Sequence, residues 1–240
     1  MIQSKLMRVI NNSLIAKDTY KIVFEAKLDA KAGQFVDVLI PGFTLRRPLS
    51  ISRIYEDSFE IIYKIKGEGT KVLSDVKAGE MLDVLGPLGN GFELVKNKKV
   101  LLIGGGIGIP PLLQLYHDLK GSNKVELLIG LNSSNENAYD EYQPFVATLD
   151  DSAYQGNVID YIKNHNLDFD YIYSCGPMGM LKAIDKLGYD GEISIEQRMA
   201  CGFGVCRGCT CKTKNNKKKR VCVEGPVFKI GEVNLDEYEN

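Results

Sequence analysis

The stretch Lys99-Val-Leu-Leu-Ile-Gly-Gly-Gly-Ile-Gly-Ile-Pro-Pro111 divides the chain into two parts of different character. Its apolar beginning, Lys99–Ile103, is typical of a strand that is buried on both faces of a parallel sheet. The glycine-rich segment that follows opens a helix, whose first turn tolerates Pro110 and Pro111 because the N–H groups missing there would have no helical partner. Strand, glycine turn and helix together predict one unit of an α/β domain.

The residues after this stretch continue the alternation of strands and helices. Apolar strands are expected at 125–130 and 171–175, and helices at 111–119 and 178–187. Such alternation indicates a parallel sheet with helices on its faces. We therefore expect an α/β domain over residues 98–191.

The residues before the stretch predict a different architecture. Short apolar or alternating runs at 20–24, 34–40 and 59–65 are separated by glycines and prolines. Several short strands at this spacing are typical of a small antiparallel barrel. The barrel is expected over residues 1–97, which leaves residues 192–240 as a small C-terminal module rich in cysteine and glycine.

The cysteines of this module follow a metal-binding spacing. Cys201, Cys206 and Cys209 form a C-x4-C-x2-C pattern, and Cys222 follows later. That pattern is typical of the four thiolates of a plant-type [2Fe–2S] cluster. Zinc is the alternative, since Cys206 and Cys209 form a C-x2-C pair, but the remaining cysteines offer no second pair of that kind. Cys211 lies outside the pattern, and we expect it to bind no metal.

The composition limits the other classes of function. The 240 residues carry a formal net charge of −1, so no overall attraction to nucleic acid or to an anionic membrane is expected. No apolar run approaches the roughly 20 residues that span a bilayer, and the N-terminus lacks the apolar segment of a signal peptide. We therefore expect a cytoplasmic protein with reduced cysteines, in which the basic run 217–220 forms a solvated hairpin tip.

The glycine-rich turn at Gly104–Gly108 predicts a dinucleotide site, since a helix that begins after such a turn can bind a phosphate. Ile109 stands where the usual motif has its third glycine, so a purely structural turn is the alternative. Cys175 ends another strand at the ligand-binding edge, where it either borders a nicotinamide or is a small buried residue. The candidate dinucleotide residues are Gly104, Gly105, Gly106, Gly108, Cys175, Gly176 and Pro177.

The charges in this half of the chain favour NADH over NADPH. There is no Lys or Arg between Lys124 and Lys163, whereas Glu136, Asp140 and Glu141 are present. An NADP site usually places a cation near the ribose 2′-phosphate, and an NAD site favours an acidic or neutral residue.

Two segments of the barrel are candidate phosphate sites. In Arg46–Ile51 an arginine can make charge-assisted bonds to a phosphate and a serine can add a hydroxyl, although a solvated basic turn is the alternative. Gly67–Thr70 exposes backbone N–H groups at a possible helix start, and here an ordinary turn is the alternative. Tyr63, between them, either flanks a flavin ring or packs in the barrel.

Taken in order, these segments resemble the ferredoxin–NADP reductase superfamily over essentially the whole chain. The C-terminal stretches Glu196–Cys209 and Val223–Phe228 further resemble the family of electron-transfer subunits of class B dihydroorotate dehydrogenases. The resemblance implies a [2Fe–2S] cluster on Cys201, Cys206, Cys209 and Cys222. It also implies FAD bound by Arg47, Pro48, Leu49, Ser50, Ile62, Tyr63, Lys64, Gly69 and Thr70.

The resemblance also implies a partner and a reaction. The partner is an FMN-containing catalytic subunit that oxidises dihydroorotate to orotate in pyrimidine biosynthesis, in a heterotetramer with two copies of each subunit, while this chain reduces NAD. A flavin belongs between NAD and the cluster, because it exchanges two electrons with one and single electrons with the other. No residue is assigned an acid–base role. Two alternatives remain: a reductase subunit of a sulfhydrogenase or glutamate-synthase-like complex, and a zinc-stabilised binding module.

Overall fold

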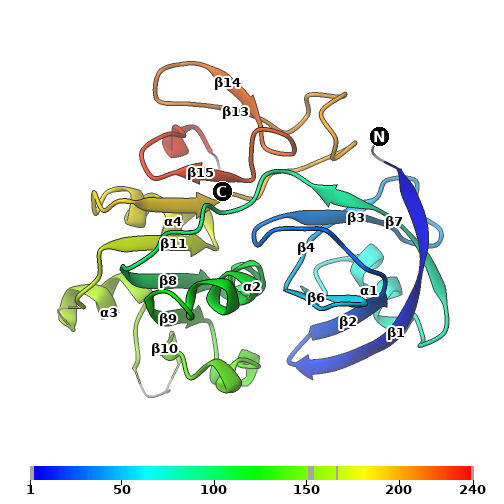
Figure 1. Cartoon of the computed structure of the whole chain (residues 1–240), viewed down its shortest axis with the longest axis horizontal. Helices are drawn as coiled ribbons and strands as arrows, with labels where there is room; N and C mark the ends of the chain where they lie inside the picture. Colours follow the sequence, from blue (N-terminus) through cyan, green and yellow to red (C-terminus); the bar gives the residue numbers. More distant parts are fainter. Residues whose placement is uncertain (1–2, 151–153, 166, 239–240) are drawn as a thin grey trace.

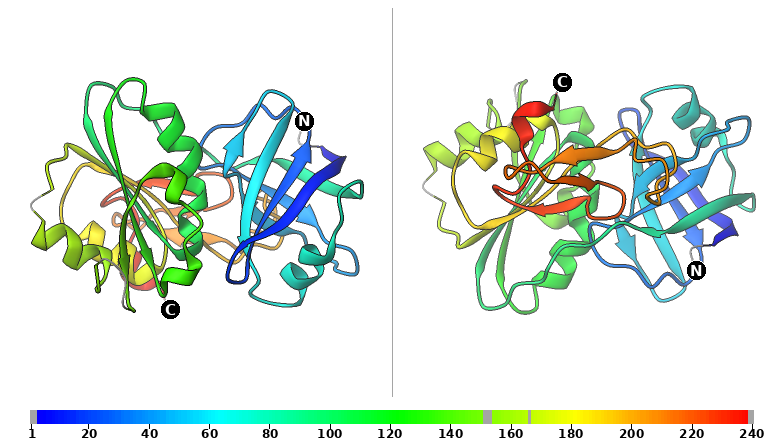
Figure 2. Two further views of the ribbon diagram at one scale, coloured as in Figure 1. Left: turned by 90° about the horizontal axis from the view of Figure 1, so that it is seen from below. Right: turned by 90° about the horizontal axis from the view of Figure 1, so that it is seen from above.

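The structure is a computed structural model that describes residues 3–150, 154–165 and 167–238. An antiparallel sheet and a mostly parallel sheet lie next to each other, and the C-terminal segments lie along one side of both (Figure 1). Figure 2 shows the same arrangement from below and from above, where the orange and red segments cross the junction of the two sheets. The expected combination of barrel and α/β domain is confirmed. No described helix is long and apolar enough to span a membrane.

The N-terminal sheet is a curled barrel with its apolar side chains inside. Phe24 and Phe59 stack at its centre, with ring centroids 5.1 Å apart, and Leu73 of helix α1 (Glu68–Asp75) is fully buried in the same core. The sheet has the order β4-β3-β7-β1-β2-β6-β5, and β4 also contacts β6 across the interior. The strands are β1 (Ser4–Ala16), β2 (Thr19–Glu25), β3 (Phe35–Leu39), β4 (Arg47–Ser50), β5 (Arg53–Ile54), β6 (Ser58–Lys64) and β7 (Met81–Leu88).

The second sheet has the order β10-β9-β8-β11-β12-β15, and its first five strands are parallel. The sixth strand, β15, pairs antiparallel with β12 at the edge. The strands are β8 (Lys99–Gly105), β9 (Lys124–Leu131), β10 (Phe145–Thr148), β11 (Tyr171–Cys175), β12 (Gly191–Ser194) and β15 (Val227–Lys229). The strands expected at 99–103, 125–130 and 171–175 are therefore confirmed.

Both faces of this sheet are covered, which explains the continuous apolar runs. Along β8, Val100 and Leu102 pack with helix α2 (Pro110–Leu119), whereas Leu101 and Ile103 pack with α3 (Val158–Asn164) and α4 (Met178–Asp185). Helix α2 also contacts the barrel, where the Ile54 N–H donates a 2.8 Å hydrogen bond to Gln114 Oε1. This helix therefore joins the two sheets, and the turn at its N-terminus faces their junction.

The cysteine-rich module is built largely from loops. Its hairpin consists of β13 (Thr210–Lys212) and β14 (Lys218–Arg220). The prediction that the basic run 217–220 forms the hairpin tip is wrong, because most of it is the returning strand and the turn lies at 214–216. The expected domain boundary between 191 and 192 falls inside β12, so the division of the chain into three domains stays a prediction. Short 3-10 turns complete the fold at Gly106–Gly108, Ser134–Glu136, Asp140–Tyr142 and Leu235–Glu237.

Candidate functional site

Two adjoining cavities lie between the barrel and the parallel sheet. The first has a volume of about 250 Å³ and is lined mostly by the barrel. The second, of about 480 Å³, is lined by the glycine-rich turns together with residues of the barrel and of the loop after β9. Cavities of a few hundred Å³ between domains are common ligand sites. The residues that line both cavities are Lys64, Lys66, Ile107, Glu196 and Gln197.

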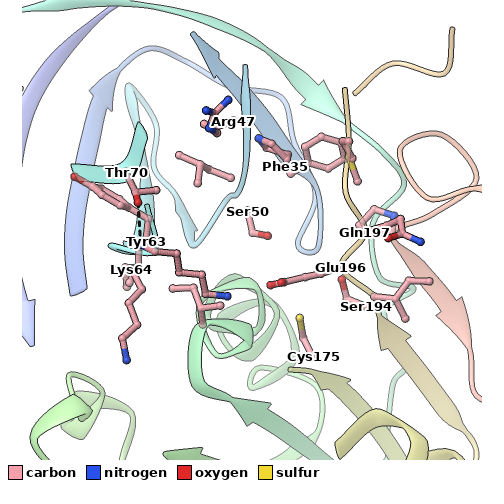
Figure 3. Close-up of a pocket in the computed structure, with 18 residues that line it drawn as sticks. Phe35, Arg47, Ser50, Tyr63, Lys64, Thr70, Cys175, Ser194, Glu196 and Gln197 are labelled. Carbon is pink, nitrogen blue, oxygen red and sulfur yellow. Dashed lines mark hydrogen bonds between the residues drawn. The ribbon is translucent and has the colours of Figure 1, made fainter. Parts of the chain in front are cut away.

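The first cavity brings together most of the residues expected to bind FAD (Figure 3). Gly69 does not line it, but a Cβ atom on Gly69 would lie 3.0 Å from Arg47 Nε. The two candidate phosphate segments of the barrel therefore meet, although they are far apart in the sequence. The expected residues on the cavity wall are Arg47, Pro48, Leu49, Ser50, Ile62, Tyr63, Lys64 and Thr70.

The contacts of Arg47 show how this corner could hold an anion. Its guanidinium lies over the Phe43 ring, 5.0 Å from the centroid, and donates a 2.7 Å hydrogen bond to the Leu45 carbonyl. The Thr70 hydroxyl accepts hydrogen bonds from the backbone N–H groups of Lys66 and Gly67, so it fixes the turn before α1. A fixed guanidinium beside a helix N-terminus fits a phosphate of FAD.

Tyr63 is anchored within the barrel. Its ring stacks on Tyr20, and its hydroxyl donates a 3.0 Å hydrogen bond to Asn12 Oδ1. Burial raises the pKa of this phenol well above its usual range, so the hydroxyl stays protonated. The alternative of packing in the barrel is therefore confirmed, and because the residue also lines the cavity, its place beside a flavin ring stays a prediction.

The second cavity brings together most of the expected dinucleotide residues, with Gly105, Gly106, Gly108, Gly176 and Pro177 on its wall. Gly104 does not line it. At Gly108 the turn meets the end of β11 closely, since a Cβ there would lie 2.4 Å from the backbone carbonyl carbon of Cys175. The bare backbone of this position therefore lets the turn at the start of α2 dock on the strand. A helix N-terminus placed in this way suits the pyrophosphate of a dinucleotide.

Cys175 lines the first cavity rather than the second, and its sulfur points into it (Figure 3). The residue is 2% exposed, and burial, with a smaller contribution from Glu196, raises the pKa of the thiol far above its usual range. It is thus a small buried residue and also a wall residue, in the neutral thiol form.

The four expected cluster cysteines form two pairs. Cys209 Sγ and Cys222 Sγ lie 3.1 Å apart, and the Cys206 backbone N–H donates a 3.4 Å hydrogen bond to Cys201 Sγ. Within the described ranges, no three His, Cys, Asp or Glu side chains are grouped so that they could hold one metal ion. Two pairs of cysteines suit a cluster of two irons that is bound by four thiolates. Cys211 is buried beside Tyr238.

Backbone N–H groups of the cysteine loop point toward sulfur. Burial alone would raise the pKa of Cys201, but hydrogen bonds from the N–H groups of Cys206, Phe203 and Val205 outweigh it and lower the pKa to about 7. The Gly208 N–H donates in the same way to Cys206 Sγ. Such donors stabilise thiolates, which are the form that binds iron.

Two contacts hold this loop against the rest of the molecule. Gly202, with φ of +72°, lies so close to β3 that a Cβ would be 1.8 Å from Asp37 Oδ2. The Gly204 carbonyl accepts a 3.0 Å hydrogen bond from Arg220 Nη1, and Arg220 is itself paired with Glu224. One residue of the basic run therefore supports the cysteine loop.

Comparison with known proteins agrees with this arrangement. Residues 196–234 match the family described as "Iron-sulfur cluster binding domain of dihydroorotate dehydrogenase B". The chain is 44% identical to a dihydroorotate dehydrogenase B (NAD(+)) electron transfer subunit of Fusobacterium nucleatum, over 95% of this chain and 97% of that protein. It is 40% identical to the protein of the same name from Bacillus mycoides, over 98% and 100%. The chain belongs to this family of electron transfer subunits.

Solved structures show the same architecture. A structure of the NADH-dependent reduced ferredoxin–NADP oxidoreductase, described for flavin-based electron bifurcation, superposes with a TM-score of 0.88 and 28% identity, over 97% of this chain and 91% of that one. Phthalate dioxygenase reductase shares the fold, with a TM-score of 0.63 and 19% identity over 96% of this chain and 77% of that one. The fold of this chain is therefore shared with both of these reductases.

The site also contains residues that the sequence analysis missed. Glu196, Gln197 and Lys66 line both cavities. Glu196 and Gln197 also lead directly into the cysteine loop. Glu196 and Gln197 belong to the stretch that carries the family resemblance, so their position next to the cysteines was an available signal. Lys66 gave no such signal. Other missed wall residues of the first cavity are Phe35, Ile107, Ser194, Ile195, Met199 and Pro226.

Proposed function

We propose that this chain carries electrons between NAD(H) and a partner subunit that oxidises dihydroorotate, by way of FAD and a [2Fe–2S] cluster. One observation carries the proposal most directly: Glu196 and Gln197 form a wall common to both cavities, and the same segment reaches Cys201 a few residues later. Two ligand sites and a cysteine loop are thus joined by one short stretch of chain. That order suits a relay from dinucleotide to flavin to cluster.

Each part of the site has its own role in this proposal. The barrel corner at Arg47–Ser50 and Gly69–Thr70 holds FAD, with Ile62–Lys64 along its side. The turns at Gly104–Gly108 and Cys175–Pro177 hold NAD. The cluster lies on the two thiol pairs, Cys201 with Cys206 and Cys209 with Cys222.

The chemistry needs positioning more than acid–base catalysis. When bound, FAD exchanges a hydride with NAD(H) and single electrons with the cluster, which by itself carries only one electron at a time. The protein holds the two ligands in adjoining cavities, and proximity of this kind removes much of the entropic barrier to transfer. Cys175 and Tyr63 both stay protonated and neutral beside the first cavity, so they add no charge to it.

The surface around the cysteine loop suits a protein partner. Phe203, Val205 and Val223 are 42%, 75% and 40% exposed, although each is apolar. Exposed apolar side chains gathered at one place commonly mark an interaction surface. The partner is the FMN-containing catalytic subunit, in a cytoplasmic heterotetramer with two copies of each chain, as the family resemblance implies.

Co-expression with a dihydroorotate-oxidising FMN protein tests the proposal. The two chains should purify together, with FAD and with about two irons and two sulfides on this chain, and should reduce NAD when dihydroorotate is added. A colourless protein that contains zinc would contradict the cluster. Stable assembly with a sulfhydrogenase or glutamate-synthase-like catalytic subunit instead would contradict the choice of partner.

A further inference from the structure

Arg220 joins two separate parts of the cysteine module. It ends β14, two residues before Cys222, and its side chain reaches back to the loop between Cys201 and Cys206. There its Nη1 donates a 3.0 Å hydrogen bond to the Gly204 carbonyl. The segment that carries the fourth expected cluster ligand is therefore connected to the loop that carries the first two.

Glu224 fixes the direction of this guanidinium. Its Oε2 accepts hydrogen bonds from the Arg220 backbone N–H at 2.7 Å and from Nε at 3.1 Å, and its Oε1 accepts one from Nη2 at 2.5 Å. A side-on pair of this kind uses two nitrogens of the guanidinium and leaves Nη1 for Gly204. Mainly through these hydrogen bonds, Arg220 lowers the pKa of Glu224 to about 2, so the carboxylate stays charged at neutral pH.

Gly204 contacts a cysteine through its other backbone group. Its N–H donates a hydrogen bond to the Cys222 sulfur, which opposes the rise in the pKa of that thiol caused by burial and by Cys209. The φ of Gly204 is +91°, a conformation that favours glycine, and a Cβ atom here would lie 2.6 Å from Val223 Cγ2. The carbonyl and the N–H of this one residue therefore link the guanidinium to an expected cluster ligand.

The positive charge of Arg220 also acts on the thiols. Hydrogen bonding to Glu224 raises the pKa of the guanidinium, and the ionised forms of Cys222 and Cys209 contribute to the same rise. The charge in turn favours the thiolate forms of these two cysteines. An added electron makes a cluster more negative, so N–H donors to its sulfurs and nearby positive charge both favour the reduced state.

We propose that Arg220 is a positioning residue for the cluster: it holds the Gly204 carbonyl, thereby aims the Gly204 N–H at Cys222, and so raises the reduction potential of the cluster. Position contributes more than charge, because the Arg220 side chain is 34% exposed and solvent screens its field. The inference rests on the proposed function, because it takes the two cysteine pairs as the cluster ligands.

A redox titration of the purified full chain tests the proposal, with the EPR signal of the reduced cluster as the measurement. In Arg220→Gln the loop loses its anchor and the charge, so the ratio of reduced to oxidised cluster at a fixed potential should fall at least tenfold. For a one-electron couple, that change lowers the midpoint potential by about 59 mV or more. Arg220→Lys keeps the charge but lacks the fork that binds Glu224 and Gly204 together, so it should show most of the same decrease.

Two further variants separate position from charge. Glu224→Ala removes a negative charge, which by electrostatics alone would raise the potential. Because the change also releases the guanidinium, we expect a lower potential instead. Lys218→Gln is the matched control, since it removes one positive charge from an exposed side chain of the same strand. Its potential should equal that of the original chain, and all four variants should keep about two irons per chain.

The outcomes separate this inference from the proposed function. If the original chain binds iron and Arg220→Gln keeps its potential, the inference is wrong. An unchanged potential in Arg220→Lys, or a rise or no change in Glu224→Ala, would show that position plays no part and would overturn it as well. If Arg220→Gln lost its iron, the direction of the shift in Glu224→Ala would decide. An original chain without iron would contradict the proposed function itself, before any variant is compared.

Discussion

The cysteine loop and the paired cavities are built in opposite ways. Three of the four expected cluster ligands fall within Cys201–Cys209, a stretch without regular secondary structure whose apolar tips face outward. The cavity walls instead come from separate stretches of the barrel, the parallel sheet and the segment after β12. A site built from one short stretch depends on its own residues, whereas a site assembled at a junction depends on how two sheets are placed. Changes in the two regions should therefore have separable effects.

The strongest test of this separation is Cys206→Ser. Loss of one thiolate removes a cluster ligand, so electron exchange with the partner subunit should fall at least 100-fold. The rate of dye reduction by NADH should stay largely unchanged, because Cys206 lines neither of the two cavities in which the flavin and the dinucleotide are expected. Stopped-flow absorbance of flavin and cluster bands follows both steps.

Cys211→Ser is the control, since Cys211 lies outside the thiol pairs and should leave the iron content unchanged. Equal loss of dye reduction and of partner reduction in Cys206→Ser would contradict the ordered relay.

A smaller effect, on the cavities alone, is expected for Gly108→Ala. Its Cβ would lie 2.4 Å from backbone atoms of Cys175, so the turn or the strand must move, at a cost of about 1–3 kcal/mol of stability. We expect the KM for NADH to rise about tenfold, by analogy with other misplaced binding groups, while the iron content stays normal. Steady-state kinetics and thermal unfolding measure the two effects.

Gly121→Ala provides the comparison, because a Cβ at Gly121 meets nothing within 4 Å. If both variants behaved alike, close docking of the turn on β11 would not be what places the second cavity.

The smallest effect concerns Asp37, where the barrel touches the cysteine loop. Burial raises the pKa of this carboxyl from 3.8 to about 6, with Arg46 opposing the shift, and Oδ1 has no hydrogen-bond partner among the described residues. Because the folded-state pKa is the higher one, the group favours folding at pH below about 4, and this contribution is lost as the pH rises to 6. The loss is at most about 3 kcal/mol.

Asp37→Asn should therefore be more stable than the original chain at pH 8 and similar to it at pH 4. Chemical unfolding at both pH values measures the difference, and Asp57→Asn, an exposed change on the same barrel, serves as the control. A variant less stable at pH 8 would mean that the charged carboxylate supports the cysteine loop.

The sequence by itself determined the elements whose signals are local. The apolar run at Lys99–Ile103 and the glycine turn after it depend on neighbouring residues, and they were confirmed as a strand and a helix start. The cysteine spacing predicted the ligands of a [2Fe–2S] cluster, and that set of ligands stays a prediction. The family resemblance also named most of the barrel residues that line the first cavity, but not those of the segment after β12. The prediction of a hairpin tip at 217–220, made from the residue pattern, was wrong, because β13 pairs with β14 and the turn lies at 214–216.

Only the tertiary structure decided what meets across the junction. Lys64 and Glu136 are far apart in the sequence, and no local pattern predicts that one neutralises the other at 2.5 Å. The same holds for Gly202 against Asp37 and for Lys66, which lines both cavities. The spacing of residues in the sequence predicts structures that neighbouring residues form by themselves. The charge on a cavity wall depends instead on how the barrel packs against the parallel sheet.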